Sequence, residues 1–145
     1  MSSQKTAEIA APPERVWELL VDPAQRLRWV DELVATVPDR PPTGVGDEFV
    51  LKIREGGDVV DYRGEVTAFE PLRRYAVRMR RGSLEIGLDH RLDDLGGGRT
   101  RLAVDVATTS SNRLLRLGGS LLSGAAARVL GTQLGRLREV AEQGS

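Results

Sequence analysis

The feature that most constrains the fold of this chain is a repeated alternation of apolar and polar residues along its central part. The alternation has a period of two and runs through residues 47–53, 59–69, 74–80, 83–95 and 101–106. The connections between these segments are the short sequences EGGD, EPLR, RGS and LGGG. Because successive side chains of a strand point to opposite faces of a sheet, the pattern predicts an antiparallel meander with one buried and one solvated face.

The phase of the alternation predicts which side chains point into the protein. The expected inner face includes Tyr62, Ala68, Tyr75, Met79, Leu88, His90 and Val104. On the outer face, Arg78 and Arg80 are expected to pair across strands with Glu65, Glu85 and Asp89, which explains these arginines without a nucleic-acid ligand. Arg81 is the exception, because its position at a strand end has inward phase.

The stretch APPERVWELLVDPAQRLRW, residues 11–29, predicts two short helices after a first strand around residues 5–11. Pro12 and Pro13 favour the first turn of a helix, and the first helix is expected to end before Pro23. Leu27, Trp29 and Val30 continue the apolar stripe in a second short helix. Helices this short are marginal alone, so we expect them to dock on the sheet or on another helix. The proline-rich residues 35–46 fit an edge strand and a loop.

Residues 111–143 have a helical pattern, with a break expected at Gly118 and Gly119 and the main helix starting near Ser120. The expected apolar face consists of Leu122, Ala126, Val129, Leu130, Leu134, Leu137 and Val140. Gln133 falls near the middle of this face and needs a hydrogen-bond partner there, which could be a neighbouring side chain, water or a ligand. The opposite side carries Gly124, Gly131, Gly135, Arg128 and Arg138. Either these glycines have no special role, or they let a second subunit approach closely and form a weak homodimer.

This order of elements resembles the helix-grip fold of the START-like, or SRPBCC, superfamily, which includes bacterial polyketide cyclase/dehydrase and lipid-transport proteins. The resemblance is carried by IAAPPERVWELLVDP at 9–23, RWV at 28–30, GVGDEF at 44–49, GEVTAFEPLRRY at 64–75 and HRLDDLGGGRTRL at 90–102. It implies an α+β fold in which a curved antiparallel sheet of about six to seven strands wraps a long C-terminal helix. It also implies a mostly apolar cavity between sheet and helix, with the two short helices completing its wall.

Composition narrows the functional classes. The formal net charge is zero, which argues against a nucleic-acid partner, and the sequence contains no cysteine, which fits a cytoplasmic location. We find no signal peptide and no apolar stretch long enough for stable membrane insertion, so residues 1–145 are expected to form a single soluble domain. A single histidine and the absence of metal-ligand spacing predict no metal site, and we expect no cofactor.

The candidate ligand-binding residues are Trp29, Tyr62, Tyr75, Met79, Leu88, His90, Val104 and Gln133. His90 is either a buried neutral histidine bonded to the backbone or an acid–base group in the cavity. Met79 lines the cavity or belongs to the core, and Tyr75 lies close to a turn at the edge of the core. Trp29 lies at the cavity mouth or anchors the second short helix, and Trp17 is interpreted as core.

Three functional classes remain open at this point. The first is binding or transport of a small hydrophobic molecule such as a lipid, polyketide or isoprenoid, oriented by Tyr62, His90 and Gln133. The second is a polyketide cyclase/dehydratase-type enzyme with His90 as the catalytic acid or base. The third is a protein-interaction module that uses the outer face of the sheet. The size of the cavity discriminates the first two classes from the third, and the protein itself is expected to be a monomer or a weak homodimer.

Overall fold

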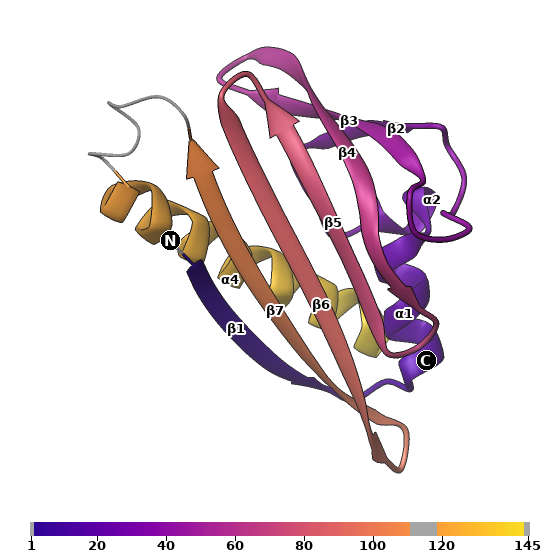
Figure 1. Ribbon diagram of the computed structural model, residues 1–145. Helices are drawn as coiled ribbons and strands as arrows, with labels where there is room; N and C mark the ends of the chain where they lie inside the picture. Colours follow the sequence, from indigo (N-terminus) through magenta and orange to yellow (C-terminus); the bar gives the residue numbers. More distant parts are fainter. Residues whose placement is uncertain (1, 111–118, 144–145) are drawn as a thin grey trace.

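Seven antiparallel strands form one curved sheet that wraps around the C-terminal helix (Figure 1). The computed structural model describes residues 2–110 and 119–143, with the side chains of residues 4–109 and 130–143. The elements are β1 (Ser2–Ile9), α1 (Pro13–Val21), α2 (Pro23–Arg26), β2 (Leu33–Val37), β3 (Glu48–Glu55), β4 (Asp58–Glu70), β5 (Arg74–Arg81), β6 (Leu84–Gly96), β7 (Arg99–Ser110) and α4 (Gly119–Gln143). The strand order β1-β7-β6-β5-β4-β3-β2 confirms the predicted α+β helix-grip fold.

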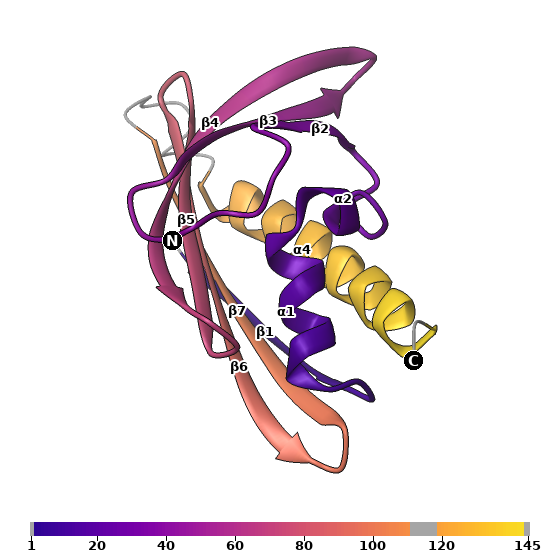
Figure 2. The ribbon, with the colours of Figure 1, turned by 90° about the vertical axis from the view of Figure 1, so that its right-hand side faces the viewer.

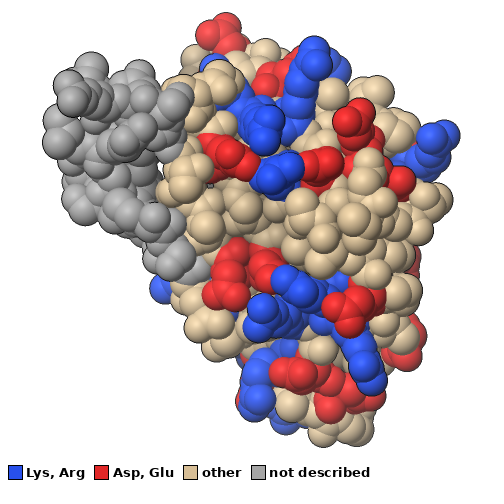
Figure 3. Space-filling view, in the orientation of Figure 1, with Lys and Arg blue, Asp and Glu red and all other residues tan. Residues whose placement is uncertain are grey.

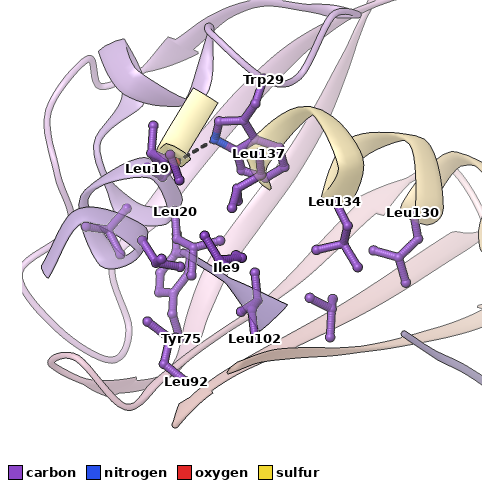
Figure 4. Packing of buried hydrophobic residues seen from close by; sticks show 14 of the residues in the cluster. Ile9, Leu19, Leu20, Trp29, Tyr75, Leu92, Leu102, Leu130, Leu134 and Leu137 are labelled. Carbon is purple, nitrogen blue, oxygen red and sulfur yellow. Dashed lines mark hydrogen bonds between the residues drawn. The ribbon is translucent and has the colours of Figure 1, made fainter. Parts of the chain in front are cut away.

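All the described helices lie on the same side of the sheet (Figure 2). The helix α4 packs along β1 and contacts α1, which brings Leu134, Leu137 and Val140 into the core. Other fully buried members of this core, each at most 1% exposed, are Ile9, Leu19, Leu20 and Leu102 (Figure 4). None of the described helices combines the length and apolar character that crossing a bilayer requires.

The two short helices follow their proline signals, but the second is shorter than predicted. The helix α1 begins at Pro13, and Asp22 ends it while its Oδ1 accepts a hydrogen bond from the Ala24 N–H at 3.0 Å, which starts α2. The single turn of α2 ends at Arg26, so Leu27 lies beyond it and is 46% exposed. The predicted apolar stripe was therefore wrong at Leu27, since the chain turns after Arg26 and buries Trp29 instead.

A β-bulge in β4 corrects the predicted inner face. The register between β4 and β5 shifts between Val66 and Ala68, so that Val66 lies opposite Val77 but Phe69 lies opposite Tyr75. The extra residue reverses the phase of the strand, because each residue inserted moves the following side chains to the other face. Phe69 thus packs against the core in the place predicted for Ala68.

The outer face of the sheet carries paired charges, as predicted for Arg78 and Arg80, but the prediction was wrong for Asp89, which pairs with Arg74 and Arg91 instead. Arg78 forms ion pairs with Glu65 and with Glu85, the latter at 3.2 Å, and Arg74 pairs with Asp89 at 2.8 Å. Figure 3 shows basic and acidic residues lying side by side over this face. Exposed pairs of this kind explain Arg74, Arg78 and Arg80 of β5 as surface structure.

The C-terminal helix starts at Gly119, close to the predicted start at Ser120. The predicted break at Gly118, and the side chains of Leu122, Gly124, Ala126, Arg128 and Val129, fall outside the described residues. Gly131 and Gly135 are exposed on the side away from the core, and a Cβ added at either of them would meet nothing within 4 Å. The space beside these two glycines is thus open, while Arg138 on the same side of the helix pairs with Glu142 at 3.3 Å.

Candidate functional site

A cavity of about 470 Å³ lies between the concave face of the sheet, the segment around α2 and the helix α4. Its wall is built mainly from the inner faces of β3 to β7, to which α4 adds Leu130, Leu134 and Leu137. Small-molecule sites are typically apolar cavities of about 300–1,000 Å³ with a few convergent polar groups. The cavity therefore has the size and the lining of a site for a small molecule.

All the candidate residues from the sequence lie in the wall of this one cavity. They are Trp29, Tyr62, Tyr75, Met79, Leu88, His90, Val104 and Gln133. The strand residues reach it because they share the inward phase, and Gln133 reaches it because it lies on the core side of α4, where it is half-buried. Whether each of them contacts a ligand stays a prediction.

His90 is 8% exposed, and its Nδ1 lies 2.9 Å from the Tyr75 carbonyl oxygen on the neighbouring strand. Because a carbonyl can only accept, Nδ1 carries the proton and donates it, which leaves Nε2 of the neutral ring as a hydrogen-bond acceptor. Burial lowers the pKa of His90 from 6.5 to about 4, against the opposing effect of the Tyr75 hydrogen bond, and the charge of Arg26 lowers it further. The imidazole is consequently neutral at physiological pH.

Tyr75 forms the wall beside His90. Its ring stacks on the imidazole with centroids 5.8 Å apart, and Trp17 and Phe69 meet it edge to face. Burial raises the pKa of the Tyr75 hydroxyl, while the nearby Arg26 acts in the opposite direction. Tyr75, predicted as a core-edge residue, thus belongs both to the core and to the cavity wall.

Trp29 fixes the segment that follows α2. Its indole Nε1–H donates a hydrogen bond of 2.7 Å to the carbonyl oxygen of Leu19 in α1 (Figure 4). The tryptophan therefore anchors the short-helix region and lines the cavity at the same time, which unites the two interpretations left open by the sequence.

Tyr62, Glu55 and Arg81 form a polar cluster at the other end of the cavity. The Tyr62 hydroxyl donates to Glu55 Oε2 at 2.8 Å, and Arg81 donates to Glu55 Oε1 at 3.0 Å while lying over the Tyr62 ring. Burial, followed by the hydrogen bond to Glu55, raises the pKa of Tyr62. The inward phase of Arg81 was visible in the sequence, but the role of Glu55 was not.

Sequence reasoning also missed Arg26, Glu32 and Arg54, which line the cavity. Arg26 is half-buried, and its Nε and Nη2 donate to the Leu20 carbonyl oxygen at 3.2 and 3.1 Å. The available signal was its spacing, because Arg26 precedes Trp29 by three residues and Val30 by four, which places it on the same side of a helical turn.

A second, smaller cavity of about 170 Å³ lies beside the first and shares Arg26, Phe49 and Tyr75 with it. Its wall includes Asp47, whose carboxylate accepts hydrogen bonds from the backbone and the hydroxyl of Thr43. These hydrogen bonds lower the pKa of Asp47, so its carboxylate stays ionised at neutral pH, and Arg40 lines the same wall. Across the part of the chain that the structure describes, no group of three acidic or histidine side chains is arranged to hold a metal ion.

A curved antiparallel sheet that grips a C-terminal helix around an apolar cavity defines a helix-grip protein of the START type. The family described as "Polyketide cyclase / dehydrase and lipid transport" matches residues 1–142, and this chain belongs to that family. No curated protein was found to match the sequence significantly.

Solved structures support the same fold. A START superfamily protein from Mycobacterium smegmatis is similar with a TM-score of 0.80 at 17% identity, over 99% of each chain. The Zhui aromatase/cyclase from a Streptomyces species is similar with a TM-score of 0.79 at 17% identity, over 99% of this chain and 94% of its own. A conserved protein from Geobacillus kaustophilus reaches 0.73 at 14% identity, over 99% and 96% of the two chains.

Proposed function

We propose that this protein binds or transports a small hydrophobic molecule in the cavity between the sheet and α4. The cavity of about 470 Å³ is the observation that carries the proposal. Burial of apolar ligand surface would drive affinity, while Tyr62, His90 and Gln133 orient the ligand. A cavity of this size disfavours the third class, a protein-interaction module that acts through the outer face of the sheet alone. We expect such a binding protein to act in the cytoplasm, as a monomer or a weak homodimer.

Native mass spectrometry of freshly purified protein tests this proposal. We expect a co-purified small molecule that is released on denaturation, and saturable binding of 1-decanol by the emptied protein. Leu88→Trp fills the cavity from β6 and should weaken decanol binding at least tenfold. Ala107→Trp places the same ring on the exposed side of β7 and serves as the control. Equal effects of the two substitutions, or no binding in any variant, would contradict the proposal.

The second candidate is a cyclase or dehydratase, which the family description and the tautomer of His90 favour. With a pKa of about 4, the neutral ring offers Nε2 as a base rather than a proton donor at neutral pH. The variant His90→Gln separates the two functions. Retained ligand affinity with lost turnover supports catalysis, whereas an equal loss of affinity supports an orienting role in a binding protein.

A further inference from the structure

Arg26 is a cation in the cavity wall whose charge the protein leaves unbalanced. Its guanidinium is half-buried and gives Nε and Nη2 to the Leu20 carbonyl, which is a neutral partner. No carboxylate oxygen of a described residue lies within 4.0 Å of it, in contrast to the ion-paired arginines of β5. A half-buried guanidinium that forms no ion pair with a described residue is available to pair with the anionic group of a ligand.

Two clusters of polar side chains lie along the cavity and differ in charge balance, and Glu32, Arg54, Thr108 and Gln133 also line it. We call Arg26, Tyr75 and His90 the inner cluster, and Glu55, Tyr62 and Arg81 the outer cluster. In the outer cluster Arg81 is neutralised by Glu55 at 3.0 Å. In the inner cluster His90 is neutral and Tyr75 retains its proton, so the charge of Arg26 remains. The inner cluster is therefore the one with a net positive charge.

The size and the lining of the two cavities decide from which side a ligand can reach Arg26. The smaller cavity, of about 170 Å³, also borders Arg26, and its wall contains Arg40 as well as the carboxylates of Asp47 and Glu48. The main cavity, of about 470 Å³, is lined mostly by apolar side chains, with Glu32 and Glu55 as its acidic members. Of the two, the main cavity has the volume and the apolar wall that the body of a hydrophobic ligand requires.

We propose that the ligand is an amphipathic acid whose apolar body fills the main cavity and whose carboxylate pairs with Arg26. Nη1 of Arg26 has two N–H groups that the Leu20 carbonyl does not use, and charge-assisted hydrogen bonds to a carboxylate are among the strongest in proteins. Tyr75 and Arg81 lie six positions apart on β5, so the two clusters are separated by about 20 Å at 3.3 Å per residue. Met79 and Val77 supply the apolar wall between them.

This inference rests on the proposed function and is tested by comparing two probes of equal chain length, decanoic acid and 1-decanol. Calorimetric titration of the wild-type protein at pH 7.5 should show at least tenfold tighter binding of the acid. The variant Arg26→Gln should remove this preference, because it lowers the affinity for decanoic acid and leaves the affinity for 1-decanol nearly unchanged. Arg54→Gln, which removes an exposed arginine from the same cavity wall, is the matched control and should keep the preference.

The outcomes separate the inference from the function on which it rests. If decanol binds as tightly as the acid, the amphipathic-acid inference is wrong and the hydrophobic-ligand function stands. If neither probe binds, both are wrong. If Arg54→Gln and not Arg26→Gln removes the preference, the carboxylate lies elsewhere. Should Arg26→Gln fail to fold, the wild-type ratio of acid to alcohol affinity still decides, and Arg26→Lys should retain part of the preference because it keeps the charge.

Discussion

The inner and outer clusters of the cavity are built from the same kinds of residue, yet they differ in burial and in charge. Each contains a tyrosine and an arginine. In the outer cluster Glu55 satisfies both of them, and Arg81 is 45% exposed. In the inner cluster Tyr75 is 4% exposed, His90 is 8% exposed, and Arg26 donates to the Leu20 carbonyl and pairs with no carboxylate of a described residue. The outer cluster is complete within the chain, whereas the inner cluster has capacity left for a ligand.

The largest expected difference between the clusters is in stability. Tyr75→Ala removes a ring that contacts Trp17, Phe69 and His90 and should lower the free energy of unfolding by about 3–5 kcal/mol. Tyr62→Ala removes a half-buried ring and should lower the free energy of unfolding about half as much as Tyr75→Ala does. Urea unfolding at pH 7 followed by circular dichroism measures both. Equal losses would contradict the assignment of Tyr75 to the core.

The pH dependence of stability sharpens the same comparison. The pKa of His90 falls from 6.5 to about 4 on folding. Between pH 6.5 and pH 4 the imidazole is therefore protonated in the unfolded chain but neutral in the folded protein. Stability from this group is present above pH 6.5 and is lost as the pH falls toward 4. Between pH 7 and pH 5 the loss is about 2 kcal/mol.

The variant His90→Gln isolates this effect from the carboxylates, since it removes the imidazole and keeps a polar side chain. Urea unfolding measures the free energy of unfolding of wild type and variant at pH 7 and at pH 5. Its decrease between the two pH values should be smaller for the variant by about 2 kcal/mol. Identical drops would mean that the folded protein accepts a proton on His90 as readily as the unfolded chain does.

A smaller effect is expected from the hydrogen bond of the outer cluster. Tyr62→Phe removes the donor to Glu55 and should cost about 1 kcal/mol. A double-mutant cycle with Glu55→Gln measures the coupling between the two side chains. A coupling near zero would indicate that the outer cluster is not held by this bond.

The smallest effect is expected on the outer face of the sheet, which lies away from both clusters. Arg78→Gln breaks exposed ion pairs with Glu65 and Glu85 and should change stability by less than about 1 kcal/mol, with the difference shrinking in high salt. Thermal unfolding at low and high salt measures it. A change as large as that of Tyr75→Ala would show that this face does more than pair charges.

The comparison also explains how far the sequence predicted the site. Strand phase correctly placed Tyr62, Tyr75 and His90 on one wall, because alternation is a local property of each strand. It failed at the bulge after Val66, where one extra residue exchanged Ala68 for Phe69 on the inner face.

The charges of the two clusters could not be predicted in the same way. Glu55 and Arg81 are 26 residues apart, and only the register of three strands brings them together. This ion pair depends on tertiary geometry, which no periodicity in the sequence reports. Arg26, the last residue of the single-turn helix α2, lines the cavity with Trp29 and Val30, and its three- and four-residue spacing to them was the available signal.

The most direct test of a ligand in this cavity uses the methyl group of Met79. The sequence contains two methionines, Met1 and Met79, so methyl-labelled methionine gives an NMR spectrum in which Met79 is the resonance from the cavity wall. On titration with decanol we predict a saturable shift of the Met79 resonance, which the variant Met79→Leu identifies by removing it. A spectrum in which decanol binds while the Met79 resonance stays in place would contradict the account.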